Sequence, residues 1–448
     1  RGSSDGGNGG RSVDGGSVGG SGDGAVDGSV AEPIAVAALD AVLDSEAMEA
    51  MEVGPRLRVA TDCSGMEAPI QALRNLGIPF DHVFSSDIDK SCVETIKANC
   101  KPKVLYGDRA SSTPEGDILL RDNSTAPESD LYVCGFPCPS FSRAGSGGGL
   151  LDPRGTVFWG CVDYITKRRP RVFVLENVAD LVQREKRKED WQCIRNALET
   201  IPGYKVSHKV MHPYEFGLPQ SRGRVYIVGM RDAEEAFEFP RPNGPISKAN
   251  GVAEQEKYVD CSDGDGGSLG ERVGEQLEKA EAFAEVVRQR GGCFFDVLQV
   301  QHSKQDPIPK QGYPYASCIA ASSYIYCVPM DRWATEGELL RLQGFPSDYR
   351  VMGTDTDRRR QLGNTICVVV LEAIFAKLLL TQTVATRYPV GAGRQPERTA
   401  AVIVRIQRIF RGHRSRRAVH RAAAPSTAPS TAPSTAPTTA DDRTTSTA

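Results

Sequence analysis

The chain has 448 residues, enough for two or three domains with a sizeable core. Its 54 basic and 57 acidic side chains nearly balance, so any binding to nucleic acid has to come from local clusters of charge. The 12 cysteines form no CxxC pairs, which argues against a zinc site or a disulfide framework and favours a reducing compartment. No apolar run is long enough to suggest that the chain crosses a membrane.

The N-terminal 54 residues divide into two parts. Residues 1–30 are mostly Gly, Ser and Asp, and they predict a disordered leader because they have too little apolar surface to offset the cost of ordering. Residues 31–54 are apolar and Ala-rich, which predicts a helical extension. That helix either caps the following domain or binds a partner.

Residues 58–76 predict a strand, a tight turn and a helix. Gly65 in the turn allows close approach of a ligand, and the amino end of the helix favours an anionic group. A second strand ends at Asp87, whose carboxylate has the spacing that suits two ribose hydroxyls. The alternative is that Asp87 only caps the helix that begins near Lys90. A third strand ends at Gly107-Asp108.

The apolar run 131–133 predicts the end of a buried strand, which Gly135 and Pro137 then break. Cys138 therefore lies on a loop beyond the carboxyl end of a strand, where open α/β sheets place their chemistry. The glycine-rich stretch 145–149 follows. A loop of that composition either closes over a substrate or is an idle flexible turn.

Charged residues follow two later apolar segments. Glu176 comes directly after the strand 172–175, and a carboxylate beside an apolar strand tends to have a raised pKa and to hold a proton near neutrality. Residues 220–228 predict another strand, whose alternation places Arg222 and Arg224 on one face. Guanidinium groups there suit phosphate and carbonyl oxygens.

The C-terminal third contains two predicted helices and a basic segment. Residues 336–342 predict an amphipathic helix closed by Gly344, and an apolar helix is expected from Gln361 through Leu380. Residues 400–421 resemble an IQ motif, the segment bound by calmodulin or a related EF-hand light chain, with Ile406–Arg416 at its centre. A basic helix resting on DNA phosphate is the alternative. Residues 422–448 repeat Ser, Thr, Ala and Pro and predict a disordered tail.

Five short motifs occur in a fixed order: GFPC (135–138), ENV (176–178), QxRxR (220–224), RLQGFP (341–346) and GN (363–364). In this order they resemble the cytosine-C5 DNA methyltransferase family. The resemblance implies an α/β fold with a mostly parallel, Rossmann-like sheet that binds S-adenosylmethionine. It also implies a catalytic and cofactor-binding domain at 55–231, a smaller target-recognition domain at 232–357, and a helix at 358–385 that returns to the catalytic domain.

The same resemblance assigns roles to single residues. Cys138 would be the thiolate that adds to carbon 6 of a flipped cytosine, Glu176 would stabilise the protonated N3, and Arg222 and Arg224 would steady the nucleotide and the catalytic loop. No metal is expected. The cofactor contacts implied are Asp87 for the ribose, Ile88 and Asp108 for the adenine, Asn364 and Thr365 near the methionine end, Pro137, and the turn Asp62, Cys63, Ser64, Gly65, Met66 and Glu67.

Three departures from the family leave alternatives open. Cys63 stands where an aromatic is usual and Glu67 where a second glycine is common, so adenine stacking is either weak or supplied elsewhere. Pro139 follows the cysteine in place of the common glutamine. The rivals to a nuclear, monomeric DNA methyltransferase are an RNA cytosine methyltransferase of the same fold and a catalytically silent scaffold that binds nucleic acid or calmodulin.

Overall fold

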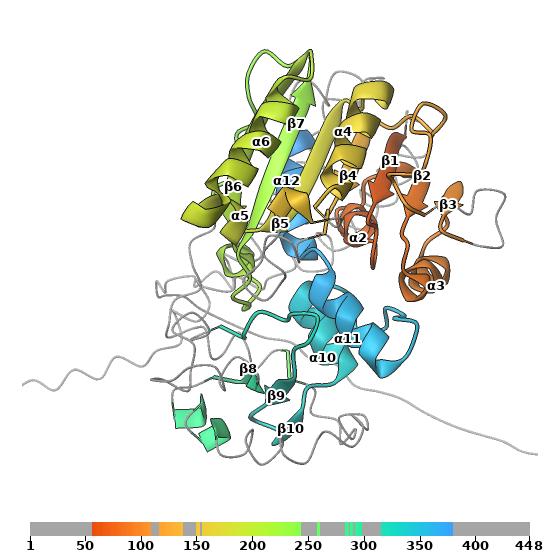
Figure 1. Cartoon of the computed structure of the whole chain (residues 1–448). Coiled ribbons are helices and arrows are strands. Elements are labelled where there is room, and N and C mark those ends of the chain that lie inside the picture. The colour runs from red at the N-terminus through yellow and green to blue at the C-terminus, as the bar shows by residue number, and fades with distance from the viewer. Residues whose placement is uncertain are drawn as a thin grey trace, which may run out of the picture. The chain divides into compact units, whose positions relative to one another are not determined.

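A computed structural model of the chain describes residues 56–108, 116–137, 149–152, 155–242, 258–259, 283–285, 287–289, 292–297 and 315–379, all within one compact unit (Figure 1). Several predictions fall outside these residues: the leader (1–30), the helical extension (31–54), Cys138 with residues 139–148, the IQ-like segment (400–421) and the repeat tail (422–448).

Seven strands form one sheet in the order β3-β2-β1-β4-β5-β7-β6. All neighbouring pairs are parallel except those of β7, which runs antiparallel to β5 and β6. The expected α/β class with a mostly parallel sheet is therefore confirmed. The strands are β1 (Leu57–Asp62), β2 (Phe80–Ser86), β3 (Val104–Tyr106), β4 (Leu131–Cys134), β5 (Val172–Val178), β6 (Tyr204–Met211) and β7 (Arg224–Arg231).

Alternation along the strands builds a separate core on each face of the sheet. In β4, Leu131 and Val133 pack into one core while Tyr132 and Cys134 pack into the other. In Figure 1, α4 and α6 lie in front of the sheet and α12 lies behind it. The first core contains α2 (Ala68–Asn75), η3 (Pro213–Phe216) and α12 (Val368–Leu379), and the second contains α4 (Val157–Arg168), α5 (Asp180–Gln183) and α6 (Lys188–Glu199). The remaining elements beside the sheet are α3 (Lys90–Asn99), η1 (Gly149–Leu151) and η2 (Glu185–Arg187).

The predicted single helix from Gln361 to Leu380 is wrong in one respect, because two helices replace it. The first, α11 (Asp355–Asn364), ends before Thr365, whose ψ of 151° is extended, and α12 then begins at Val368. Together they form the one helical segment of the described chain that is long and apolar enough to cross a membrane, but 72% of its most apolar stretch is buried inside the protein. The segment is therefore a core element, and its break faces the cleft described below.

A second, three-stranded antiparallel sheet has the order β10-β9-β8, formed by β8 (Phe294–Asp296), β9 (Ile325–Cys327) and β10 (Arg332–Trp333). It has its own small core, which includes Val287, Phe295, Tyr326 and Trp333. The predicted helix after it is α10 (Glu336–Gln343), which starts with a capping box between Thr335 and Glu338. It ends at Gly344, whose φ of 88° is the left-handed conformation that closes helices.

The amino ends of the central strands surround a small apolar cavity. Leu57 begins β1, Leu131 begins β4, Val172 begins β5, and all three line this cavity. Leu378 and Leu379, at the end of α12, also line it. The start of the first strand and the end of the last described helix therefore lie close together, at the amino ends of the strands.

Candidate active site

A large cleft opens at the opposite end of the strands, where the carboxyl ends of β1 and β4 lie side by side. From β1 the chain continues outward to β2 and β3, and from β4 it continues to β5 on the other side, so this is the point at which the strand order reverses. Open α/β sheets bind ligands at such a point. The cleft has a volume of about 390 Å³. Its lining includes the turn 61–65, residues 86–89, 116–119 and 135–137, Glu176, both predicted arginines and residues 360–361 and 363–366.

The turn after β1 is held against the end of β2. Ser64 donates its backbone N–H to the Ser86 carbonyl at 3.0 Å, and Gly65 donates its N–H to Oδ2 of Asp87 at 2.9 Å. Gly65 has a φ of 53°, the left-handed region that glycine adopts readily. Cys63 shares this conformation at a φ of 48° and also lines the cleft. The turn thus presents short side chains and backbone groups to a ligand.

Asp87 lies at the carboxyl end of β2 as predicted, half-buried and facing the cleft. Its Oδ1 accepts the N–H of Asp89 at 2.9 Å, while Oδ2 accepts that of Gly65. Burial raises the pKa of Asp87 to about 6 despite these two hydrogen bonds. The alternative role as a helix cap is wrong, because Asp89 caps α3 by accepting the N–H of Ser91 at 2.9 Å.

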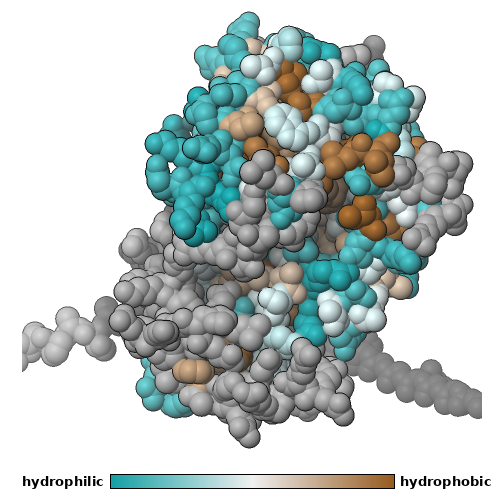
Figure 2. Space-filling model, viewed as in Figure 1, coloured by the Kyte–Doolittle hydropathy of each residue, from teal (hydrophilic) through white to brown (hydrophobic). Residues whose placement is uncertain are grey.

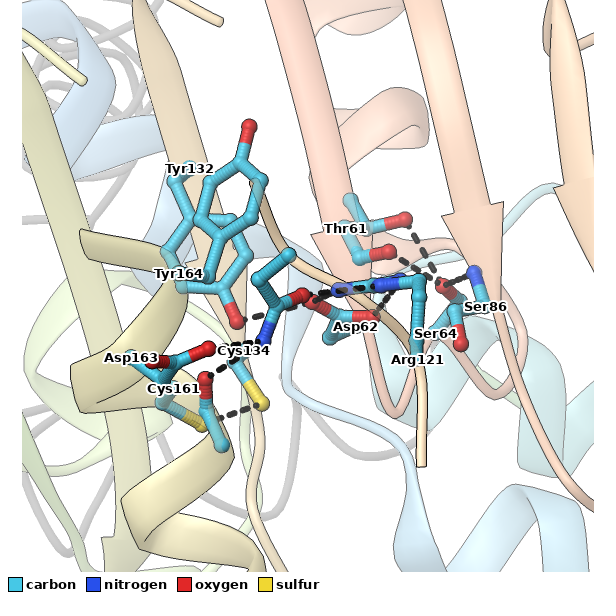
Figure 3. A network of polar contacts seen from close by, with 12 residues as sticks. Thr61, Asp62, Ser64, Ser86, Arg121, Tyr132, Cys134, Cys161, Asp163 and Tyr164 are labelled. Carbon is cyan, nitrogen blue, oxygen red and sulfur yellow. Dashed lines mark hydrogen bonds and ion pairs between the residues drawn. The ribbon is translucent and has the colours of Figure 1, made fainter. Parts of the chain in front are cut away.

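Asp62 lines the cleft, but the protein already occupies both of its carboxylate oxygens (Figure 3). Arg121 donates to them at 2.9 and 2.8 Å, and the Tyr132 hydroxyl donates to Oδ2 at 2.9 Å. Burial by itself lowers the pKa of Arg121, but the negative charge and hydrogen bonds of Asp62 have the larger effect. The pKa of the guanidinium is therefore raised. That guanidinium also lies over the rings of Tyr106 and Phe84, at 4.6 and 4.9 Å from their centroids. The ion pair therefore ties the segment before β4 to the end of β1.

Three of the residues predicted to contact a cofactor do not line the cleft. Met66 and Glu67 are buried behind the turn. Asp108 points to α3, where it accepts a hydrogen bond from Lys97 at 2.8 Å. The acid that does line the cleft after β3 is Asp117, which the sequence analysis missed.

Gly116, next to Asp117, is packed against the end of β2. Ser86 donates its hydroxyl to the Gly116 carbonyl at 2.9 Å, and a Cβ at Gly116 would lie 2.5 Å from the Asp87 carbonyl oxygen. Only glycine fits so close to another backbone. The signal that could have identified this segment is a second Gly-Asp pair that follows the first along the chain.

Apolar side chains border the same part of the cleft. Brown apolar surface interrupts the teal surface on the face shown in Figure 2. Among the described residues, the large apolar side chains that remain exposed are Ile88 (76%), Leu120 (72%), Leu119 (43%) and Trp159 (41%). Ile88 and Leu119 both line the cleft, so an apolar ligand group would cover surface that is otherwise in water.

Glu176 lies at the other end of the cleft and inside β5, since that strand continues to Val178 and pairs with β7. Its carboxylate is buried, and its Oε1 lies 3.1 Å from Nε of Arg224. Burial raises the pKa of Glu176, and the positive charges of Arg224 and Arg222 partly oppose this rise. The next residue, Asn177, donates to the Phe136 carbonyl at 3.0 Å and so holds the segment that leads to Cys138.

Arg222 and Arg224 do not share one face of a strand, because β7 begins only at Arg224. Arg222 is 2% exposed, and its guanidinium donates to three backbone carbonyls. These belong to Ile319 at 2.6 Å, Gly363 at 2.9 Å and Thr365 at 2.7 Å. Arg222 therefore joins the chain beside the small sheet to the break between α11 and α12.

The described part of the cleft brings together Gly135, Pro137, Asn364 and Thr365. A Cβ at Gly135 would lie 3.3 Å from Cδ1 of Ile366 and 3.5 Å from Oε2 of Glu176, so these segments are closely packed. The predicted nucleophile, Cys138, follows Pro137 directly and lies outside the described residues. Among the residues that are described, no group of three or more His, Cys, Asp or Glu side chains could hold a metal ion.

Comparison with known proteins matches residues 61–380 to a family model described as C-5 cytosine-specific DNA methylase. The Type II methyltransferase M.NlaX of Neisseria lactamica is 33% identical over 298 residues, which are 65% of this chain and 86% of that protein. M.HaeII of Haemophilus aegyptius is 30% identical over 308 residues, or 68% and 88% of the two chains. A solved structure of a putative DNA modification methyltransferase encoded within an E. coli prophage has a TM-score of 0.50 at 19% identity, covering 72% of this chain and 98% of that one.

Proposed function

This chain belongs to the C-5 cytosine-specific DNA methylase family and is a DNA cytosine-5 methyltransferase, and we propose how the residues of its cleft divide the reaction. The observation that carries the proposal is the position of Glu176. Its buried carboxylate shares one cleft with Asp87 and with the Gly65 turn, so a cytosine and a nucleoside cofactor could meet between them. The family match also favours DNA over the RNA alternative.

The described residues fit S-adenosylmethionine. The cleft volume of about 390 Å³ lies within the range of small-molecule sites. Asp87 can accept from ribose hydroxyls, Ile88 can cover the adenine, and the Gly65 turn with Asn364 can hold the methionine end. When bound, the cofactor supplies a methyl group on a positively charged sulfur.

Asp117 replaces Asp108 in this assignment as the acid for the adenine amino group. Asp117 lines the cleft beside Leu119, whereas Asp108 is held by Lys97 outside it. Met66 and Glu67 are likewise withdrawn as direct contacts, since both are buried behind the turn. Asp62 contributes through its place in the turn, because Arg121 and Tyr132 occupy its carboxylate.

Glu176 acts on the cytosine ring. The rise in its pKa favours the protonated carboxyl group, and a protonated or hydrogen-bonded N3 makes carbon 6 electrophilic. Arg224 keeps the carboxyl oriented and limits the rise of its pKa. The cytosine has to leave the DNA helix to enter this buried position.

Cys138 is the nucleophile in this proposal, on the basis of the GFPC motif and of its place directly after Pro137. The thiolate forms a bond to carbon 6, which makes carbon 5 nucleophilic. After methylation, a base removes the proton from carbon 5. The carbon–sulfur bond then breaks, and the aromatic ring is restored.

Trapping tests this role of Cys138. DNA with 5-fluorocytosine at the target has no proton to lose from carbon 5, so a methylated protein–DNA adduct should accumulate and survive denaturing electrophoresis. Its formation should require S-adenosylmethionine and should be lost in Cys138→Ser, because a serine hydroxyl stays protonated near neutrality. Labelled methyl transfer to matched DNA and transfer RNA should favour DNA. A Cys138→Ser variant with normal turnover would remove Cys138 from its role.

We also propose that residues 400–421 bind calmodulin or a related EF-hand protein. The support is the IQ-like spacing of Ile406–Arg416, which in a helix would place apolar side chains on one side of a basic surface. A peptide of residues 402–421 should bind calmodulin, and Ile406→Asp should abolish binding by placing a charge in an apolar groove. Salt-sensitive binding to DNA instead would favour the phosphate alternative.

A further inference from the structure

Glu67 keeps a glycine-like backbone at the position where glycine is common in the family. Its φ of 57° and ψ of 44° lie in the left-handed region, which is strained for a residue that has a Cβ. Glu67 is also fully buried, with none of its surface exposed. A buried carboxylate in a strained conformation persists only where its surroundings hold it there.

Three side chains converge on Oε1 of Glu67. The Thr61 hydroxyl donates to it at 2.7 Å, the Ser85 hydroxyl donates at 2.5 Å, and Nε2 of His82 lies 3.4 Å away. Thr61 belongs to β1, and the other two belong to β2. The carboxylate therefore reaches back from the start of α2 to both strands that frame the turn.

One arm of this network leads to the cleft. Thr61 gives its only hydroxyl proton to Glu67, so its oxygen can accept from the Ser64 hydroxyl in the 2.7 Å contact between them. The Thr61 backbone carbonyl, at 3.1 Å, is a second acceptor for the same Ser64 proton. The Ser64 hydroxyl in turn accepts the backbone N–H of Ser86 at 2.9 Å. Figure 3 shows this end of the arm, from Thr61 through Ser64 to Ser86.

The other arm leads away from the cleft. Ser85 gives its proton to Glu67, so its oxygen accepts from Nε2 of His82 at 2.9 Å. The Thr61 and Ser85 hydroxyls thus both donate to the carboxylate, which can only accept, while the Ser64 hydroxyl also has the Thr61 carbonyl as an acceptor at 3.1 Å. Glu67 orients the hydroxyls of Thr61 and Ser85 directly, and through Thr61 it provides an acceptor for Ser64 in the cleft lining.

We propose that Glu67 is a positioning residue for the cofactor turn. Acting through Thr61, it holds Ser64 and Gly65 in the arrangement in which the Gly65 N–H meets Asp87. Glu67 itself does not line the cleft. The inference rests on the proposed function, since it concerns the same cofactor site. Its loss should weaken cofactor affinity and leave the rate at saturating cofactor unchanged.

Glu67→Gly separates backbone strain from the hydrogen-bond network. Glycine accepts this φ without strain, which offsets part of the stability that is lost when the buried hydroxyls of Thr61 and Ser85 lose their acceptor, so the melting temperature should fall only modestly. The lost acceptor should raise the Kd for S-adenosylmethionine about tenfold, while kcat at saturating cofactor and the affinity for DNA stay unchanged. Glu67→Gln keeps an acceptor oxygen in the same shape and should restore cofactor affinity.

A matched pair of variants tests the direction of the effect. Thr61→Val removes the hydroxyl that links Glu67 to Ser64, with little change of side-chain shape. Ser85→Ala removes the other hydroxyl that donates to Oε1 of Glu67, the one in the arm that leads away from the turn. Calorimetry should show weaker cofactor binding for Thr61→Val and nearly normal binding for Ser85→Ala. Equal losses in the two variants, or wild-type affinity in a folded Glu67→Gly, overturn the inference.

The Asp87→Ala variant separates this inference from the proposed function. Loss of binding in Asp87→Ala with no response in Thr61→Val or Glu67→Gly refutes the role of Glu67 alone. A wild-type protein that binds no S-adenosylmethionine refutes the proposed function itself. If Glu67→Gly does not fold, the comparison of Thr61→Val with Ser85→Ala decides the question.

Discussion

Nε of Arg224 lies 3.1 Å from Oε1 of Glu176, so the carboxyl group assigned to cytosine N3 has a fixed positive charge beside it. Burial raises the pKa of this carboxyl group, and the positive charge of Arg224 opposes that rise more strongly than the charge of Arg222 does. Arg224→Ala should therefore raise the pKa of Glu176 further. In the proposed mechanism the protonated form of Glu176 is the active one, so the limb of the pH–rate profile that falls with rising pH should move to higher pH. A profile that moves to lower pH would contradict this arrangement.

Glu176→Gln should lower kcat by about 10²–10⁴-fold while much of the DNA affinity remains, because a neutral amide cannot supply a proton to N3. Single-turnover methylation measures the effect. Glu372→Gln is a matched control on α12: burial also raises the pKa of this acid, to about 7, but its partner is Asn75, outside the cleft. Comparable losses of kcat in both variants would show that the effect is not specific to Glu176.

Asp117→Ala should weaken S-adenosylmethionine binding, because Asp117 lines the cleft. Asp108→Ala should not, since Asp108 does not line the cleft and its partly exposed ion pair with Lys97 is worth less than about 1 kcal/mol of stability. Titration calorimetry on the two variants compares them directly. Weaker binding in Asp108→Ala alone would restore the assignment made from sequence.

The affinity for S-adenosylmethionine should depend on the ionisation of Asp87. Burial raises its pKa to about 6, and the ionised carboxylate is a stronger acceptor for the ribose hydroxyls than the protonated acid. Affinity should therefore be constant above that pKa and fall as the pH decreases through it. Asp87→Ala should bind more weakly and show no such step. Calorimetry across this pH range measures both proteins, and a flat wild-type curve would argue against Asp87 as the ribose ligand.

Arg222→Ala should destabilise the protein rather than slow the chemistry selectively. The substitution leaves the buried carbonyls of Ile319, Gly363 and Thr365 without their donor, a loss on the order of 3 kcal/mol in the free energy of unfolding. Denaturant unfolding measures that loss. Arg224→Ala, whose side chain is at the cleft, is the comparison and should lose less stability. Equal unfolding free energies for wild type and Arg222→Ala would contradict the structural role.

Sequence reasoning located the parts of the site that local patterns determine. The Gly65 turn, Asp87 at a strand end and Glu176 beside an apolar strand each follow from a few neighbouring residues. The role of Arg222 could not be predicted in this way, because its partners are backbone carbonyls at 319, 363 and 365, brought near only by the fold.

Two other features could not be predicted from the sequence, because the same local pattern is compatible with more than one structure. Residues 365–367 include no Gly or Pro that would end a helix, so the sequence predicts one helix. The structure instead has a break at the extended Thr365, whose carbonyl accepts a hydrogen bond from Arg222. Asp108 and Asp117 each follow a glycine, and only the packing of Gly116 against Asp87 shows which acid lies at the cleft.

The small cavity shared by Leu57 and Leu379 bears on how this enzyme could be rearranged. The first residue of β1 and the last residue of α12 are therefore close together, at the amino ends of the strands and away from the cleft. A short linker between them, with new ends opened at the turn after α6, should give a circular permutant that still binds cofactor. For the same reason, a further domain joined before β1 or after α12 would be attached away from the cleft.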